Sequence, residues 1–121
     1  MPISTHILDT SLGVPVRGIL VRLERCGSTR QDFGTENELE WIICGEEYTN
    51  EDGRTPNISK HIDLSAGVYR CLFFTSVYFE SSETPYFHPR IEVMFKVHDT
   101  SEHYHIPLLL SPFGYTTYRG S

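Results

Sequence analysis

The chain has 121 residues and a formal net charge of −6. The length is typical of one domain, and we expect residues 1–121 to fold as one. Nucleic acid is bound by basic surfaces, so the acidic balance argues against a nucleic-acid partner, although a local basic pocket could still hold a small anion. No apolar run approaches the roughly 20 residues that span a bilayer, so no membrane partner is expected.

The three cysteines show no Cys-x-x-Cys spacing, which argues against a zinc knuckle or a redox pair. They are Cys26, Cys44 and Cys71. We expect buried or half-buried free thiols, as in a reducing compartment. His6 and Asp9 interrupt any signal-peptide pattern near the N-terminus. A cytoplasmic location is therefore expected; a peroxisomal one stays open, although the chain ends in Arg-Gly-Ser rather than the Ser-Lys-Leu signal.

Apolar and polar residues alternate in several short segments, which predicts strands because successive side chains on a strand point to opposite faces. The predicted strands cover residues 3–10, 18–26, 39–44, 67–77, 90–98, 103–111 and 114–119. Residues rich in Gly, Pro, Asn and Asp predict turns or loops between them, at 12–15, 26–38, 50–53 and 81–89. The weakly patterned residues 58–65 could form one short helix.

Short strands at near-regular spacing, separated by turn residues, are typical of an antiparallel β-sandwich. The segment 103–111 separates two faces clearly, with Tyr104 and Leu108 on one and His103 and His105 on the other. Pro107 cannot donate a ladder hydrogen bond, so an edge or an irregularity is expected there. The fold class predicted from the residues is therefore all-β.

Three separated segments carry a more specific pattern. They are Ser4–Asp9, Thr49–Arg54 and the C-terminal run His103–Ser121, which ends in Tyr-Arg-Gly-Ser. In content and order they resemble the enzyme branch of the transthyretin-like family, the 5-hydroxyisourate hydrolases, over nearly the whole chain. Residues 27–47 look longer or more divergent than the usual family connection, without touching a motif.

This resemblance implies a sandwich of two four-stranded sheets, assembled as a homotetramer. It implies a hydrolase without a cofactor that opens a cyclic amide of 5-hydroxyisourate, the unstable product of urate oxidation. Carried onto this chain, it assigns catalysis to His6, His105 and Arg54. Substrate binding falls to Arg54 and to the C-terminal residues Tyr118, Arg119, Gly120 and Ser121. In the family these residues gather at the dimer–dimer interface, where the tails of neighbouring subunits shape the pocket.

The chemistry of these residue types fits amide hydrolysis. An imidazole titrates near neutrality and can take a proton from water and later return it. A planar guanidinium pairs with an anionic, imide-rich ring and stabilises a developing oxyanion. Whether His6 or His105 removes the proton from water stays open at the level of the sequence.

Three other interpretations fit the sequence less well. A zinc site at His98, His103 and His105 would need a further ligand, and no Cys or carboxylate falls at a recognisable spacing, so no metal is predicted. A carrier of hydrophobic hormones on the same fold would lack the terminal Tyr-Arg-Gly-Ser and the site histidines and arginine, all of which are present. An adhesive or structural sandwich would leave the motif-bearing tail unexplained. We expect His61 and His88 to be structural or surface residues.

Overall fold

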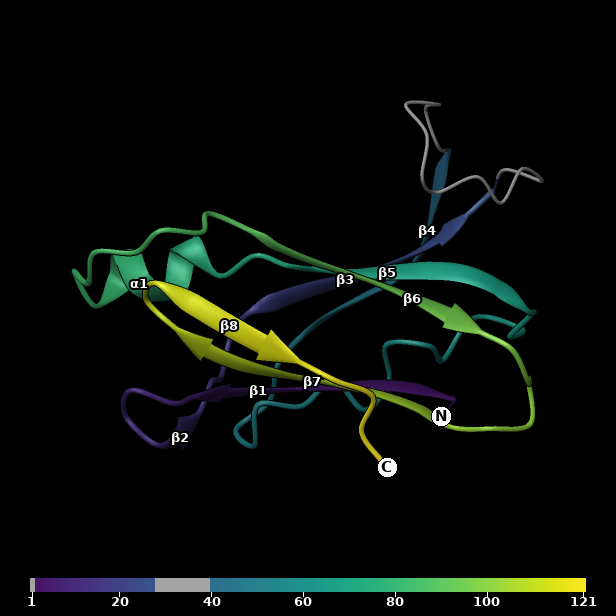
Figure 1. Ribbon diagram of the computed structural model, residues 1–121, viewed down its shortest axis with the longest axis horizontal. Helices are drawn as coiled ribbons and strands as arrows, with labels where there is room; N and C mark the ends of the chain where they lie inside the picture. Colours follow the sequence, from purple (N-terminus) through teal and green to yellow (C-terminus); the bar gives the residue numbers. More distant parts are fainter. Residues whose placement is uncertain (1, 28–39) are drawn as a thin grey trace.

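The computed structural model describes residues 2–27 and 40–121, which form two four-stranded sheets layered face to face (Figure 1). The first sheet has the order β2 (Val14–Pro15), β1 (Ile3–Asp9), β7 (Tyr104–Ser111) and β8 (Gly114–Thr117). The second has the order β4 (Trp41–Tyr48), β3 (Leu20–Cys26), β5 (Gly67–Phe73) and β6 (Ile91–Val97). A short helix, α1 (Ser76–Ser81), lies at one end of the sandwich.

The predicted two-sheet sandwich is confirmed, but one strand pair does not run antiparallel. β1 and β7 are parallel, with Ser4 opposite His105 and His6 opposite Pro107. Parallel strands need a long crossover connection rather than a hairpin, and most of the chain lies between these two. The parallel register places Ser4 directly beside His105 on the outer face of the sheet.

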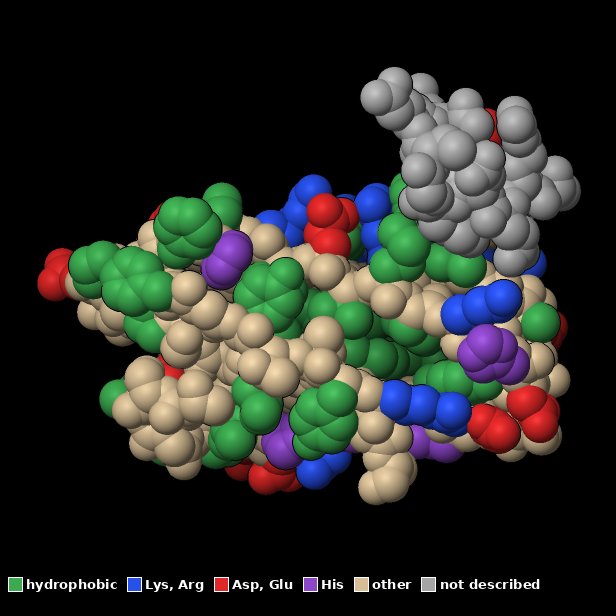
Figure 2. All heavy atoms as spheres, in the orientation of Figure 1, with side chains coloured by type: hydrophobic (Ala, Val, Ile, Leu, Met, Phe, Trp, Pro, Cys, Tyr) green, Lys and Arg blue, Asp and Glu red, His purple; other side chains and the backbone are tan. Residues whose placement is uncertain are grey.

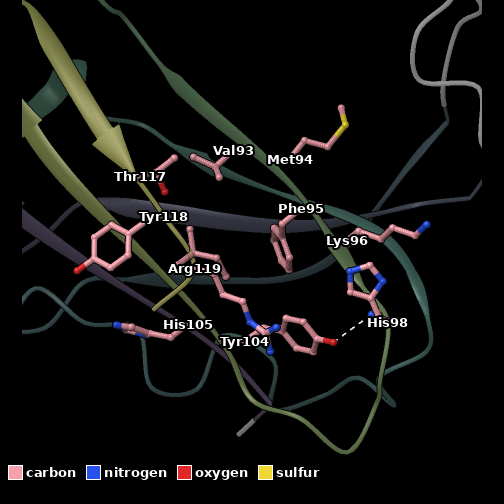
Figure 3. Close-up of a pocket in the computed structure, with 11 residues that line it drawn as sticks. Val93, Met94, Phe95, Lys96, His98, Tyr104, His105, Thr117, Tyr118 and Arg119 are labelled. Carbon is pink, nitrogen blue, oxygen red and sulfur yellow. Dashed lines mark hydrogen bonds between the residues drawn. The ribbon is translucent and has the colours of Figure 1, made fainter. Parts of the chain in front are cut away.

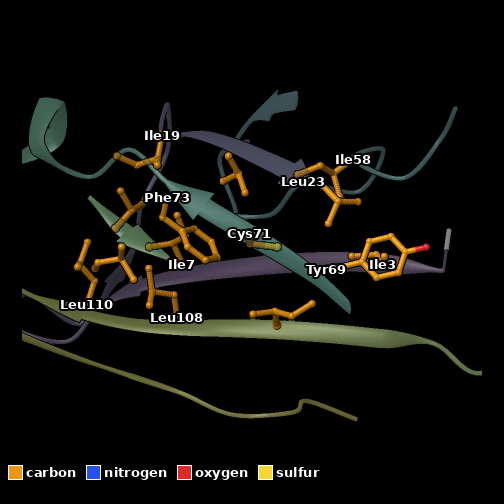
Figure 4. Packing of buried hydrophobic residues seen from close by; sticks show 14 of the residues in the cluster. Ile3, Ile7, Ile19, Leu23, Ile58, Tyr69, Cys71, Phe73, Leu108 and Leu110 are labelled. Carbon is orange, nitrogen blue, oxygen red and sulfur yellow. The ribbon is translucent and has the colours of Figure 1, made fainter. Parts of the chain in front are cut away.

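The core lies between the sheets and is filled by alternate residues of each strand (Figure 4). In β1 the inward residues Ile3 and Ile7 are fully buried, and in β7 so is Leu108. Each such side chain stabilises the fold by about 1.5–3 kcal/mol through removal from water. Because neighbours on a strand alternate, burial of these residues turns His6 and His105 to the outer face, where both are half-buried.

The helix was predicted in the wrong place. Residues 58–65 form turns and irregular backbone, whereas α1 begins at Ser76, within the last two residues of the predicted 67–77 strand. The β5 ladder ends where the Phe74 N–H bonds to the Leu20 carbonyl, and Thr75 already has helical φ and ψ. Thr75 and Phe79 are then buried together at helical spacing. The sequence pattern does not reveal this change from strand to helical spacing, because residues 71–74 are apolar on both faces.

Several other strand boundaries differ from the predictions, and Val14–Pro15, which falls in a predicted turn, forms β2. The strand predicted at 39–44 is β4, Trp41–Tyr48, and it continues through the acidic residues 46 and 47 because Glu46 reaches Arg22 on the neighbouring strand at 3.3 Å. The last strand stops at Thr117 instead of residue 119. The predicted loop 26–38 and the start of the 39–44 strand lie largely outside the described residues.

All three thiols are free, with Cys26 and Cys71 buried and Cys44 half-buried, as predicted. Burial raises the pKa of the Cys71 thiol to about 12. That side chain therefore acts as a small hydrophobic residue of the core rather than as a nucleophile. Within residues 2–27 and 40–121, no helix has the length and apolar character that a membrane crossing would need.

Candidate active site

A polar hollow of about 410 Å³ opens on the outer face of the first sheet. It gathers side chains from both ends of the chain and from the 50–54 turn. Its lining residues are Ser4, His6, Arg54, His103, His105, Pro107, Tyr118, Gly120 and Ser121. All the predicted site residues except Arg119 lie in this hollow, although they come from three segments far apart in sequence.

Two imidazoles form the floor of the hollow. His6 lies on β1 and His105 on the adjacent β7, with ring centroids 6.3 Å apart and ring planes inclined by 35°. That separation leaves the two rings close enough to act on one small molecule and too far apart to bond to each other directly.

Arg54 reaches the hollow because a tight turn returns the chain to β1. The Asn50 side-chain oxygen accepts hydrogen bonds from the N–H groups of Asp52 and Arg54, at 2.9 and 3.0 Å. Gly53 has a φ of +75°, and a Cβ there would lie 2.4 Å from the Ile7 carbonyl oxygen, so only glycine fits. A bridge between His6 and Arg54 then places both side chains on one face.

Beyond the end of β8, the C-terminal tail runs beside β7, where Gly120 forms an antiparallel bridge with His105 (Figure 1). The Gly120 N–H donates to the His105 carbonyl at 2.8 Å. A Cβ on Gly120 would lie 2.5 Å from Cδ2 of His105, so the tail rests directly against that ring. The ladder between β7 and β8 ends at Leu108, next to Pro107, where an edge or an irregularity was predicted.

Arg119 is the exception among the predicted site residues. Its guanidinium lies 2.6 Å from the Glu102 carboxylate and 4.6 Å from the centre of the Tyr104 ring. The Tyr104 hydroxyl in turn accepts a hydrogen bond from the His98 N–H at 3.0 Å, drawn as a dashed line in Figure 3. Arg119 therefore anchors the tail on the side facing β6 instead of pointing into the polar hollow.

Arg119 borders a second, more apolar hollow of about 310 Å³ between β6 and the tail. Figure 2 shows hydrophobic side chains gathered there, with charged groups at the margin. Val93, Phe95 and Ile106 contribute to its lining. No local pattern in the sequence indicates this hollow, because it forms between the edges of two different sheets.

Three residues of the polar hollow, Ser4, His103 and Pro107, were not among the predicted site residues. Ser4 Oγ lies 2.9 Å from His103 Nε2 and 2.8 Å from His105 Nδ1, so one hydroxyl bridges two imidazoles. The alternation of side chains along the strands could have identified Ser4 and His103, since it puts Ser4 on the face of His6 and His103 on the face of His105.

The surroundings favour neutral imidazoles. Partial burial, and after it the positive charge of Arg54, lower the pKa of His6, against an opposing effect of Asp52. Partial burial, then Arg54 and the neighbouring His6 and His103, lower the pKa of His105. Both rings are therefore free to accept a proton near neutral pH.

Chemically, the hollow combines proton acceptors with a cation. In the described parts of the chain, Arg54 forms no salt bridge, so its guanidinium is available to an anionic ligand. Over the same residues, no group of three or more His, Cys, Asp or Glu side chains is arranged to hold a metal ion. The arrangement suits proton transfer to and from a small, polar, negatively charged molecule.

Comparison with known proteins gives similarity over nearly the whole chain. Residues 3–120 match the HIUase/Transthyretin family. The 5-hydroxyisourate hydrolase of Mus musculus is 38% identical over 120 residues, which cover 99% of this chain and 95% of that protein. The structure of Klebsiella pneumoniae 5-hydroxyisourate hydrolase superposes with a TM-score of 0.75 at 33% identity, covering 98% of this chain and 92% of that one.

A structure of sea bream transthyretin in complex with thyroxine superposes with a TM-score of 0.81 at 31% identity, covering 99% of this chain and 95% of that one. The chain is therefore about equally similar to hydrolases and to a transthyretin. The residues of the polar hollow, rather than the fold, must distinguish between them.

Proposed function

The chain belongs to the HIUase/Transthyretin family, and on that premise we propose that it hydrolyses 5-hydroxyisourate to 2-oxo-4-hydroxy-4-carboxy-5-ureidoimidazoline in urate degradation. It is a hydrolase, as are the similar proteins of Mus musculus and Klebsiella pneumoniae. The observation that carries the proposal is the convergence of His6, His105, Arg54 and the C-terminal residues in one polar hollow. We propose that residues 1–121 form a single hydrolase domain.

The reaction needs an activated water. A histidine takes a proton from the water as its oxygen bonds to the ring carbonyl carbon, and the carbonyl electrons move onto oxygen. Collapse of this oxyanion breaks the C–N bond, and the departing nitrogen takes up the proton that the histidine held. His6 and His105 are the two candidates, and the lowered pKa of each keeps it in the basic form near neutral pH.

Arg54 and the tail have complementary roles in this proposal. The Arg54 guanidinium binds the anionic substrate and stabilises the oxyanion. An oriented cation lowers the barrier most at the oxyanion, because negative charge develops there in the transition state. Tyr118, Gly120 and Ser121 cover the hollow from one side, position the substrate and exclude bulk water. Arg119 contributes indirectly, by holding the tail through Glu102 and Tyr104.

We further propose a homotetramer with the sites at the dimer–dimer interface. The hollow lies on the outer face of a sheet, and the half-buried apolar residues Leu8 and Leu109 belong to the same face. A second copy that packed there would bury these residues and enclose the substrate. The free thiols support a cytoplasmic location.

A hormone carrier is the alternative that the family raises. Three imidazoles, a guanidinium and a chain terminus line the hollow, and such a polar lining suits a hydrophobic hormone poorly. The same residues suit a small ring with several carbonyl and N–H groups. The hydrolase proposal therefore accounts for more of the site.

The test follows the ultraviolet decay of 5-hydroxyisourate, generated in situ by urate oxidase, with and without the protein. A parallel sample lacks residues 118–121. We expect strong acceleration by the full chain, and loss of most of it in the truncated chain with the fold retained by circular dichroism. A folded full-length protein that does not accelerate decay, and that binds thyroxine instead, would contradict the proposal.

A further inference from the structure

We propose that Ser4 and His103 form a proton relay to His105, which makes His105 rather than His6 the group that takes the proton from water. This inference rests on the proposed hydrolase function and assigns roles within the same site. The observation behind it is that Ser4 Oγ lies within hydrogen-bonding distance of both His103 Nε2 and His105 Nδ1.

The backbone holds this bridge in place. The parallel pairing of β1 and β7 sets Ser4 opposite His105, and both residues point outward. His103 lies two residues before His105, on the same side, with ring centroids 6.4 Å apart. His103 is exposed whereas His105 is half-buried, so the chain of three groups runs from the hollow to solvent.

The orientation of the His105 ring leaves one nitrogen for the substrate. Its Nδ1 faces Ser4, and its Cδ2 edge is covered by Gly120. Among the described residues, none hydrogen-bonds to Nε2 of His105. Nε2 is therefore the ring nitrogen of His105 available to a water bound in the hollow. His6 has no comparable bridge to a second proton carrier in the part of the chain that the structure describes.

A hydroxyl has one proton to donate, so it cannot donate to both rings. We assign the resting state in which His105 Nδ1–H donates to Ser4 Oγ, and Ser4 Oγ–H donates to His103 Nε2. In this tautomer His105 Nε2 carries a lone pair directed at the hollow, as a general base requires. Ser4 thus selects the tautomer of His105.

Proton transfer through the relay balances atom by atom. An O–H bond of water breaks as the His105 Nε2–H bond forms. The His105 Nδ1–H bond then breaks as a new Ser4 O–H bond forms, and the old Ser4 O–H bond breaks as His103 Nε2–H forms. The reverse sequence returns a proton to His105 Nε2 for the departing nitrogen, and no other reactant is needed.

The groups that face His105 from neighbouring segments also matter for its titration. From β1 they are Ser4 and His6, from the 50–54 turn Arg54, from just before its own strand His103, and from the tail Tyr118 and Ser121. Arg54 and the two other imidazoles all disfavour a charged His105 ring. A path that carries the proton away from this ring therefore assists its role as a base.

The experiment compares kcat, KM and their pH dependence for the full-length protein and the variants Ser4→Ala, Ser4→Thr and His103→Ala. His61→Ala is the matched control, because His61 is exposed and does not line the hollow. We expect Ser4→Ala and His103→Ala to lower kcat about 100-fold, the lower end of what proton transfer contributes, with KM little changed. Ser4→Thr, which keeps the hydroxyl, should retain most of kcat.

Added imidazole separates a relay from a purely structural role. It should restore kcat in His103→Ala, where the missing group is exposed, and not in Ser4→Ala, where the link itself is absent. Nitrogen-15 NMR of the imidazoles adds a readout independent of turnover: His105 should be the Nδ1–H tautomer in the unmodified protein and lose that preference in Ser4→Ala.

The outcomes distinguish the relay from the proposed function. An active protein whose Ser4→Ala and His103→Ala variants keep kcat, or lose activity through KM without imidazole rescue, would overturn the relay and leave the hydrolase intact. An unmodified protein without hydrolase activity would overturn both. An Nε2–H tautomer of His105 in the active protein would overturn the relay as well.

Discussion

At the residue scale, Arg54 connects substrate binding with the protonation of both histidines. Its positive charge disfavours imidazolium, and after partial burial it is the next largest cause of the lowered pKa of His6 and of His105. One guanidinium therefore holds two imidazoles in the basic form while it remains free to meet an anion. Removing it should affect both the rate and the pH profile.

We expect Arg54→Gln to lower kcat/KM about 10²- to 10³-fold, because an oriented oxyanion partner is lost. The acid limb of the pH profile should also move to higher pH. Without the cation each histidine has a higher pKa, so imidazolium persists to higher pH and the base is lost earlier on acidification. Arg54→Lys should slow the reaction but leave the acid limb in place, and a limb that stays unmoved in Arg54→Gln would contradict the electrostatic link.

A second residue-scale prediction concerns Gly120, which touches the His105 ring. An added Cβ would lie 2.5 Å from Cδ2 of His105 and 3.1 Å from Pro107 Cγ, so either the tail or the ring must move. We expect Gly120→Ala to lower kcat/KM about 100-fold, since a displacement of about 1 Å can cost that much. Thermal unfolding should be little changed. Gly114→Ala offers a control, because Gly114 has no positive φ and an added Cβ there would meet only the Ser111 hydroxyl, at 3.8 Å. Unaltered kinetics would mean that the tail does not position His105.

At the scale of elements, α1 is tied to the end of β1 through one buried carboxylate. The Tyr78 hydroxyl donates to Asp9 Oδ2 at 2.6 Å, while Ser11 and Leu12 donate to the other oxygen. Burial acts to raise the pKa of Asp9, but these hydrogen bonds outweigh it and lower the pKa. The helix thus packs against the Asp9 carboxylate, whose orientation is set by hydrogen bonds from the turn after β1.

We expect Tyr78→Phe to lower the free energy of unfolding by about 1–3 kcal/mol, because a buried carboxylate loses a donor. Urea denaturation monitored by circular dichroism measures the change. Tyr86→Phe is the matched control: its hydroxyl also bonds to a carboxylate, Glu80, but at an exposed position, so the effect should be much smaller. Equal effects of the two substitutions would argue against the buried link.

At the scale of the whole molecule, the candidate site lies on an outer face, and its last residue, Ser121, is exposed. In the proposed tetramer a neighbouring subunit would complete the enclosure of the substrate. Enclosure strengthens the electrostatic interactions on which the oxyanion and the relay depend, because water no longer screens them.

The assembly prediction is a loss of specific activity on dilution. Below the concentration at which sedimentation shows dissociation, we expect kcat to fall steeply, whereas a covalently cross-linked sample should keep its activity. A dissociated subunit with undiminished kcat would show that each site is complete by itself, contrary to the proposed interface.

The all-β class and the inward or outward facing of most strand residues follow from the amino-acid sequence, because period-two alternation is a local property of the chain. The sequence also pointed to His6, Arg54, His105 and the tail through three motifs, and these residues converge in one hollow apart from Arg119. The α1 segment was missed because apolar residues on both faces of the preceding strand hid the change from strand to helical spacing.

Features that depend on partners far apart in sequence became visible only in the folded chain. The parallel pairing of β1 with β7 joins residues about 100 positions apart, and it alone puts Ser4 between His103 and His105. Arg119 turns away from the hollow because Glu102 and the Tyr104 ring offer it an ion pair and an aromatic face. A long side chain adopts the rotamer that its surroundings stabilise, and those surroundings exist only once the two sheets and the tail have come together.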